Sequence, residues 1–354
     1  MVKDEDIIGY DALWESMMKC KRGVIWKDSV AKFVLNGPQE IYKLSNELAD
    51  GTYVERQHKF FEVESPKRRQ IMSISFRDRV YQRSLNDVAV YPEMVKHFIY
   101  DNCACQKGKG TKFARDRLKC HLQRYFRKYG TEGYILKIDV KGYYPNMRHD
   151  VAKDVFKRYL DNNVYERVEK VLDGFPGEVG FYPGSQVIQI AGISILNDID
   201  HYIKEVLRAK YYVRYMDDMV VISNDAEYLS NVMREVSEKL QEIGFCVHPE
   251  KTTITPIRDG LVFLGFQYKL TGTGKVILTA DPVRVKAERR KLRRLVAMAK
   301  EGKITREKVD QCYVSWKAHV SQGNSYHLIK NMDTYYQELW RCGNAENCKT
   351  KDAT

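Results

Sequence analysis

Two adjacent acids, Asp217 and Asp218, interrupt an otherwise apolar segment that runs from Tyr211 to Ser223. Aromatic and β-branched residues on both sides of the pair are typical of two strands joined by a tight turn, so the sequence predicts a β-hairpin with both acids at its tip. Adjacent carboxylates repel each other unless a cation lies between them and a further acid. A solvated turn would also explain an isolated Asp-Asp pair, and the rest of the chain distinguishes the two explanations.

A third acid, Asp139, ends another apolar segment. Residues 132–146 predict a strand that stops at Asp139 and turns through Gly142. A carboxylate without a partner is unfavourable in a half-buried strand, whereas a metal site at a sheet edge requires one. Helical periodicity in residues 151–160 and 188–207 predicts a crossover that brings the two acid-bearing strands side by side.

The composition narrows the class of protein. A net charge of +12 indicates a polyanionic partner, with nucleic acid favoured over an anionic membrane surface. The start of the chain has no apolar signal region, and no stretch approaches the roughly eighteen apolar residues that span a bilayer, so we expect a cytoplasmic protein without a membrane partner. The chain has eight cysteines, which we expect to be free thiols because Cys103 and Cys105 are too close for a zinc knuckle.

Basic segments precede the first acid. Residues 1–55 have helical spacing, residues 58–64 predict a strand, and a basic turn leads into a helix that carries Arg77, Arg79 and Arg83. These arginines suit a triphosphate or a nucleic-acid backbone, and a solvated charged face is the alternative. Residues 103–111 form a loop of glycines and lysines that could approach a phosphate, although their order is not that of a Walker loop.

Six motifs in chain order resemble those of reverse transcriptases. Asp217 and Asp218 close a Tyr-Met-Asp-Asp sequence that resembles the family signature, and Asp139 with Tyr144 resembles the first catalytic motif. The other four are similar to the fingers motif, the template-and-nucleotide loop, the fourth palm motif and the primer grip, at Arg69–Arg79, Gly180–Gln189, His248–Thr252 and Phe263–Phe266.

The resemblance implies an α+β fold, that of a right-hand polymerase, in which the palm is an antiparallel sheet backed by helices with the acids at one edge. The implied domains are a helical extension, fingers, a palm with finger insertions, a helical thumb and a polar tail, at residues 1–55, 56–132, 133–270, 271–342 and 343–354.

The resemblance also implies RNA-directed DNA synthesis by nucleotidyl transfer. Two Mg²⁺ ions, for which Mn²⁺ can substitute, would lie about 3.5–4 Å apart. Asp139, Asp217 and Asp218 are the implied ligands together with the Val140 carbonyl, and Lys251 is the implied proton donor to pyrophosphate. The implied nucleotide contacts are a triphosphate clamp, a residue that excludes a 2′-hydroxyl and two loop residues, namely Arg69, Tyr144, Gly184 and Gln189. The implied template–primer contacts are Gly265 and the thumb arginines Arg289, Arg290, Arg293 and Arg294.

Within the family the chain most resembles the bacterial group II intron-related branch, and in particular the enzymes of diversity-generating retroelements, at Cys105–Thr111, Tyr212–Tyr215 and Ser315–His319. Two residues depart from that pattern, because Ile188 replaces a small hydroxyl residue and Gln106 stands where many relatives carry Arg. A defence-associated reverse transcriptase that copies a dedicated non-coding RNA, or needs little template, therefore stays open. An inactive RNA-binding scaffold is a further alternative, against which the three acids argue. The expected partners are an RNA template, a DNA or RNA primer and dNTPs, and the retroelement interpretation adds a structured RNA and a small basic accessory protein.

Overall fold

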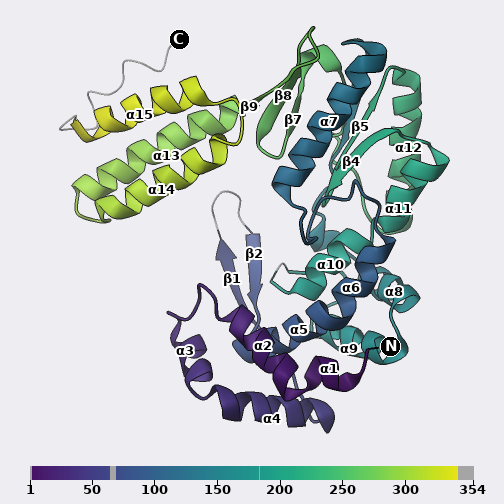
Figure 1. Ribbon diagram of the computed structural model, residues 1–354, viewed down its shortest axis with the longest axis vertical. Coiled ribbons are helices and arrows are strands. Elements are labelled where there is room, and N and C mark those ends of the chain that lie inside the picture. Colours follow the sequence, from purple (N-terminus) through teal and green to yellow (C-terminus); the bar gives the residue numbers. More distant parts are fainter. Residues whose placement is uncertain (1, 64–68, 183, 342–354) are drawn as a thin grey trace. The chain divides into compact units, whose positions relative to one another are not determined.

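The computed structural model describes residues 2–63, 69–182 and 184–341 (Figure 1). The chain divides into two compact units, each assembled from separate segments. The first unit contains Met1–Ala114, Leu136–Val221 and Ser230–Thr253, and the second contains Arg115–Ile135, Ile222–Leu229 and Ile254–Thr354. Helices and sheets are mixed along the chain, which confirms the expected α+β class.

Four helices open the first unit: α1 Asp4–Ile8, α2 Tyr10–Cys20, α3 Asp28–Leu35 and α4 Gly37–Ala49. Apolar residues three and four positions apart bury one face of each longer helix, as with Leu13 and Met17 of α2. A proline in the first turn of α4 suits the start of a helix, where its missing N–H leaves no bond unmade. Helix α2 packs against α5, which spans Phe76–Leu85.

An antiparallel hairpin precedes α5. Strand β1, Lys59–Val63, pairs with β2, Arg69–Ser73, and Lys59 lies opposite Ser73. The remaining helical segments of this unit include the π-helix η1 Asn86–Val90, α6 Tyr91–Met94, η2 Val95–His97, η3 Tyr144–Asn146, α8 His149–Tyr159, α9 Asn162–Asp173, α10 Gln186–Ser194, α11 Asn197–His201 and the π-helix η4 Tyr202–Val206. The helices between residues 149 and 206 include the predicted crossover.

A four-stranded sheet has the order β4-β5-β3-β6, with β4 Tyr211–Tyr215, β5 Asp218–Ser223, β3 Tyr134–Ile138 and β6 Thr253–Pro256. Strands β3 and β5 are therefore neighbours, although about eighty residues separate them in the sequence. Strand β4 is buried almost throughout and Met219–Ile222 of β5 is buried completely, which explains their continuous apolar runs. The helix α12, Ala226–Glu242, follows β5.

The second unit contains most of α7, Thr111–Tyr129, and an antiparallel sheet with the order β7-β8-β9. Its strands are β7 Leu261–Phe263, β8 Phe266–Leu270 and β9 Val276–Ala280. Helices α13 Pro282–Lys300, α14 Arg306–Val320 and α15 Tyr326–Arg341 share an apolar core that includes Leu292, Val309 and Met332. None of the helices in the described part of the chain is both long and apolar enough to cross a membrane.

Candidate active site

The hairpin of β4 and β5 carries its acids differently from the prediction. Strand β5 begins at Asp218, so the two linking residues are Met216 and Asp217, and the placement of Asp218 in the turn was wrong. Met216 has a φ of 55°, in the left-handed region that L-residues adopt at a cost of about 1–2 kcal/mol. Two-residue hairpins need a positive φ at the first linking position because only then does the turn match the strand twist.

The three acids lie near enough to one another to interact electrostatically. Asp139 directly follows β3, the strand beside β5. The pKa of Asp217 is raised to about 6, mainly by burial and in part by the carboxylates of Asp218 and Asp139. Burial also raises the pKa of Asp218, with Asp139 adding to the rise and Lys137 opposing it. The site therefore concentrates negative charge where water is partly excluded.

Two lysines balance part of this charge. Lys137 Nζ lies 3.4 Å from Asp218 Oδ1, and Lys251 Nζ lies 3.3 Å from Asp139 Oδ1. Sequence reasoning had assigned Lys251 but missed Lys137. The alternation of a strand gives a signal for it, because residues two apart lie on one face and Lys137 precedes Asp139 by two.

The oxygen atoms at this site are of the type that binds a hard divalent cation. Mg²⁺ prefers carboxylate and carbonyl oxygens, and Asp218 Oδ1 is buried without a well-oriented hydrogen bond from any described residue. Val140 and Val247 form an antiparallel bridge, and its hydrogen bonds are made by the residues on either side of Val140: Lys141 N donates one and Asp139 O accepts the other. The bridge does not use the Val140 carbonyl, which lies on the opposite edge of its strand. Among the described residues, no three acidic, cysteine or histidine side chains stand close enough together to form a ready metal cage.

Tyr144 lies beside these acids, at the start of the short helix η3 that follows Asp139. Burial raises the pKa of its hydroxyl, and Cys105 and Asp217 contribute to the rise. A Cβ at Gly192 of α10 would lie 3.1 Å from Tyr144 Oη and 3.3 Å from Met216 Cε, so a glycine there makes room for both side chains. Tyr144 and the Met216–Asp217 turn therefore both pack near Gly192 of α10.

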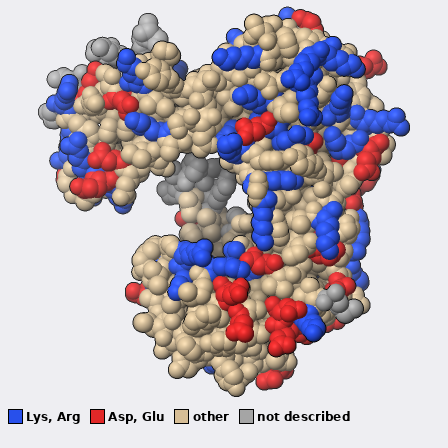
Figure 2. Space-filling model, viewed as in Figure 1, with Lys and Arg blue, Asp and Glu red and all other residues tan. Residues whose placement is uncertain are grey.

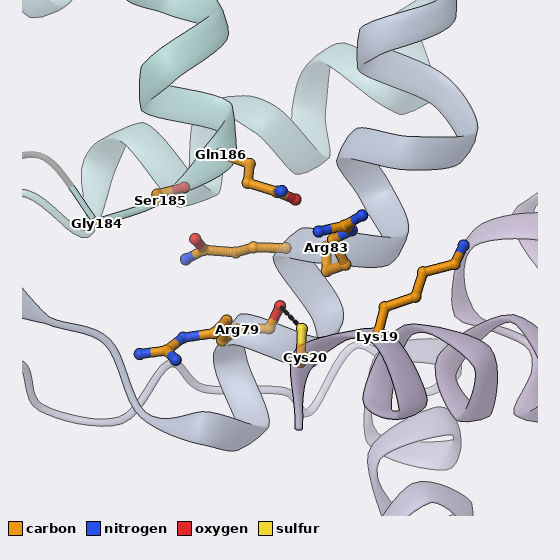
Figure 3. A pocket seen from close by; sticks show the side chains of 8 residues that line it. Lys19, Cys20, Arg79, Arg83, Gly184, Ser185 and Gln186 are labelled. Atoms are coloured by element: carbon orange, nitrogen blue, oxygen red, sulfur yellow. Dashed lines mark hydrogen bonds between the residues drawn. The ribbon is translucent and has the colours of Figure 1, made fainter. Parts of the chain in front are cut away.

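A basic pocket surrounds the start of α10 (Figure 3). Its lining consists of Lys19, Cys20, Arg79, Gln82, Arg83, Gly184, Ser185 and Gln186. The Ser185 hydroxyl caps α10 by accepting from Val187 N, and a Cβ at Gly184 would lie only 2.8 Å from Met72 O, so the chain needs glycine at this approach. The free N–H groups and positive end of a helix favour an anion.

The three cations of this pocket differ in their partners. Arg83 and Lys19 share Asp87, with N–O distances of 2.7 and 3.5 Å. Arg79 makes no ion pair within the described residues, and Figure 3 shows its side chain directed away from Arg83 and Lys19. Cys20 Sγ contacts the Arg79 carbonyl at 3.8 Å, and burial raises the pKa of this thiol to about 11, so it stays protonated at neutral pH. Arg79 is therefore the cation most available to a phosphate.

Arg77 does not join this basic surface. Its side chain is buried, pairs with Glu47 and Asp78, and lies over the Tyr53 ring with Cζ 4.8 Å from the ring centroid. The expectation that Arg77 faces a phosphate together with Arg79 and Arg83 was wrong. Residues on successive turns of a helix share a face only when they are three or four positions apart. Arg79 and Arg83 therefore start from the same face of the helix, and Arg77 starts from another.

Other sequence-predicted residues have distinct environments. Gln189 is exposed on α10, whereas Ile188 is completely buried and can influence a template only through packing. Gln106 donates to Asn102 O at 2.7 Å, which orders the glycine-lysine loop. Arg69 begins β2 opposite Val63, and its side chain lies outside the described part of the structure.

The predicted template–primer residues of the second unit divide into two sets. Leu264 and Gly265 link β7 to β8, both with positive φ, and a Cβ on Gly265 would lie 2.8 Å from Arg284 Nη1. On α13, Arg290 and Arg294 are exposed, whereas Arg289 packs over the Tyr335 ring. Arg293 is half-buried one turn from Arg289. Figure 2 shows basic and acidic side chains interleaved over this group of helices.

A family model described as reverse transcriptase (RNA-dependent DNA polymerase) matches residues 62–268, more than half of the chain. The chain belongs to this family. That match includes all three acids, Tyr144, the start of α10 and Lys251. No curated protein matches this reverse transcriptase significantly.

The solved structures to which the chain is similar include telomerases of two Candida species. An apo telomerase of Candida tropicalis truncated from its C-terminal domain is 14% identical, with a TM-score of 0.48 over 66% of this chain and 58% of that one. Telomerase of Candida albicans with a fragment of telomeric RNA is 12% identical, with a TM-score of 0.48 over 86% and 65%. A further apo telomerase of Candida tropicalis gives 13% and 0.45 over 73% and 54%. This chain thus spans about half to two thirds of those proteins.

Proposed function

We propose that this protein is an RNA-directed DNA polymerase that extends a primer at Asp139, Asp217 and Asp218. The observation that carries the proposal is the convergence of these three carboxylates, two of them with raised pKa values, in a chain of the reverse transcriptase family. Such a concentration of partly buried negative charge is unfavourable without a cation and is suited to cation binding.

The chain's own residues would divide the work at this site. Asp139 and Asp217 would hold the cations directly, with the Val140 carbonyl as a further ligand and Asp218 in support. Bound Mg²⁺ or Mn²⁺ would activate the primer hydroxyl and stabilise charge on the leaving pyrophosphate. Lys251, whose side chain is half exposed, would donate a proton to the pyrophosphate.

Substrate recognition would rest on residues around these acids. Tyr144 would exclude a nucleotide 2′-hydroxyl, so that DNA is made. Arg69 would bind the triphosphate as a planar fork, and Gly184 and Gln189 would lie near the template base and the nucleotide. Arg290 and Arg294 would meet the backbone of the template–primer duplex, because both are exposed on α13.

The biological setting that we propose is a diversity-generating retroelement, with a structured RNA and a small basic accessory protein as partners. The segments Cys105–Thr111, Tyr212–Tyr215 and Ser315–His319 support this choice. A defence-associated enzyme is the second candidate, favoured by Ile188 and Gln106. Sequencing the RNA that copurifies from the native host separates them: a variable-repeat template supports the first, and a short dedicated RNA supports the second.

Primer extension on an RNA template tests the activity itself. The wild-type protein should incorporate dNTPs with Mg²⁺ or Mn²⁺, and Asp139→Asn or Asp217→Asn should abolish incorporation. Offering each dNTP separately, with and without RNA, reveals whether the template chooses the nucleotide. Retention of full activity by either variant would refute the site assignment, and an inactive wild-type protein that still binds RNA would support the scaffold alternative.

A further inference from the structure

Arg214 is an unusual residue for the strand that carries it. It lies in β4 with no solvent exposure, and it is the largest fully buried side chain of the described residues. A charge in the interior is strongly unfavourable unless its partners replace the lost water. The function described above assigns no role to this guanidinium, so its contacts are informative.

One edge of the guanidinium is held by an acid. Arg214 Nε and Nη2 donate to the two carboxylate oxygens of Asp200, at 2.7 and 2.5 Å. Asp200 lies on α11 and is also fully buried, and Tyr212 Oη donates to its Oδ1 at 2.7 Å. Such a two-pronged pair fixes the plane of the guanidinium as well as its position.

The other donors reach two backbone carbonyls. Arg214 Nη2 donates to Ile193 O, near the C-terminal end of α10, and Nη1 donates to Met216 O, each at 2.9 Å. Met216 is the linking residue with a φ of 55°, and its carbonyl belongs to the peptide that leads into Asp217. The guanidinium thus holds a strained peptide next to a catalytic acid.

We propose that Arg214 is a positioning residue that keeps the Met216–Asp217 turn in its left-handed form and so aims the Asp217 carboxylate. Asp200 orients Arg214, and Arg214 holds the turn. Without the bond to its carbonyl, Met216 is free to relax toward negative φ, which rotates the following peptide and displaces Asp217. This proposal rests on the polymerase function proposed above, because it assigns a purpose to the position of Asp217.

The first test replaces Arg214 by lysine. A single ammonium can neutralise Asp200 but cannot also reach the Met216 carbonyl as a planar fork does. We expect Arg214→Lys to lower kcat about 10- to 100-fold, as small misplacements of reacting groups do, with little change in the KM for the RNA template. We also expect weaker Mn²⁺ binding, measured directly by electron paramagnetic resonance, and faster hydrogen exchange at the Asp217 amide.

Arg77→Lys is the matched control. Arg77 is another buried arginine of the same unit, paired with Asp78 and Glu47, and it makes no described contact with the turn. The Arg77→Lys substitution should leave Mn²⁺ affinity and hydrogen exchange at the Asp217 amide unchanged, even if it lowers the melting temperature. Equal effects of the two lysine substitutions on Mn²⁺ affinity would overturn the proposal.

A second test introduces Arg214→Lys into a Met216→Gly protein, in which the strain at position 216 is relieved. Glycine adopts positive φ without the steric penalty of a side chain, so the turn needs less support in a Met216→Gly protein. Arg214→Lys should therefore lower Mn²⁺ affinity by a smaller factor in that background than in the wild type. An equal factor in both backgrounds contradicts a role in holding the turn.

A paired replacement covers the case in which Arg214→Lys does not fold. Arg214→Met with Asp200→Leu removes both charges, and buried ion pairs exchanged for apolar residues often keep their stability. This variant should fold but bind Mn²⁺ weakly, and wild-type affinity in it refutes the proposal. Failure of the wild type to extend a primer refutes the polymerase function, whereas an active wild type with unaffected variants refutes only the positioning role.

Discussion

The β4–β5 hairpin contains a buried arginine, whereas helix α13 presents arginines to solvent. At the hairpin, the Arg214 guanidinium is buried and makes four hydrogen bonds of 2.5–2.9 Å. On α13, Arg290 and Arg294 are exposed to solvent on the unit that also carries the three-helix core. We therefore expect activity at the hairpin to depend on the exact position of each group. We expect duplex binding by the face of α13 that carries Arg290 and Arg294 to depend on the number of its charges.

The difference also divides α13 itself. Arg289 Cζ lies 5.5 Å from the Tyr335 ring centroid and Nε donates to Met332 Sδ at 3.4 Å, so this arginine belongs to the packing of its unit. Arg290 follows it directly but faces solvent. This basic helix thus contains both packed and solvent-exposed arginines, and two neighbouring residues can be used to compare them.

The largest effect is expected at the hairpin. Asp217→Asn keeps the shape of the side chain but removes a negative charge that the reaction needs, so kcat should fall at least about 10³-fold. Single-turnover primer extension measures this loss. Asp225→Asn, at an exposed residue whose capping bond to Tyr228 N an amide oxygen can keep, is the control and should remain fully active. A loss below tenfold for Asp217→Asn would contradict the dependence on position.

A partly buried acid of the first unit, Glu55, extends the comparison to stability. Burial raises the pKa of Glu55 to about 7, with Asp78 adding to the rise, so the folded state binds this proton more tightly than the unfolded state. Its stabilising contribution is complete below the unfolded pKa of about 4.5 and is lost as the pH rises through about 7. Glu55→Gln should remove about 2 kcal/mol of pH dependence between about pH 5 and 8.

Urea unfolding at several pH values measures this effect. Glu250→Gln, at an exposed position, should leave the dependence unchanged. If Glu55→Gln and wild type lose stability in parallel as the pH rises, burial at Glu55 does not carry the effect.

An intermediate effect is expected at Tyr144. Truncation by Tyr144→Ala should open space beside the nucleotide sugar and reduce discrimination against rNTPs about 10- to 100-fold, the range expected for a steric pocket. The ratio of kcat/KM for dNTP and rNTP measures the change. Tyr143→Phe removes only the hydroxyl that donates to Gly192 O and keeps the neighbouring ring, so it should preserve the ratio. Unchanged discrimination in Tyr144→Ala would assign sugar selection elsewhere.

The smallest effect is expected on α13. Arg290→Ala should weaken binding of a template–primer duplex only a few-fold and reduce the slope of log affinity against log salt by about 1. Fluorescence anisotropy at several salt concentrations measures both. Arg289→Ala is the neighbouring control, which should lower thermal stability with little change in slope because Arg289 packs on Tyr335. A larger slope change for Arg289 than for Arg290 would reverse the assignment of the two faces.

The sequence predicted those features that local patterns encode. The reverse transcriptase family, the α+β class and the adjacency of β3 and β5, beside whose ends Asp139 and Asp217 lie, all follow from apolar runs, turn residues and motif order. The hairpin tip was misplaced by one residue because both Asp217 and Asp218 tolerate a turn, and the strand pairing that includes Asp218 is a tertiary property.

Long-range partners explain the other differences. Arg77 looks like part of a basic surface until Glu47, thirty residues earlier, is seen to pair with it. In the sequence, Arg214 is noticed only as part of a segment that resembles retroelement reverse transcriptases. Its role was missed because sequence spacing identifies neither Asp200 nor the Met216 carbonyl as its partner. A charge inside a continuous apolar strand was the available signal, and it indicates a partner without identifying one.

Gly192 has a consequence for substrate choice. A methyl group at this position would press on the hydroxyl end of Tyr144 and on Met216, since its Cβ would lie 3.1 Å from Tyr144 Oη and 3.3 Å from Met216 Cε. The ring that we assign to choosing deoxyribose over ribose would then have to shift. We therefore expect the room available for the sugar to depend partly on a residue with no side chain, on a helix that packs near the tyrosine hydroxyl.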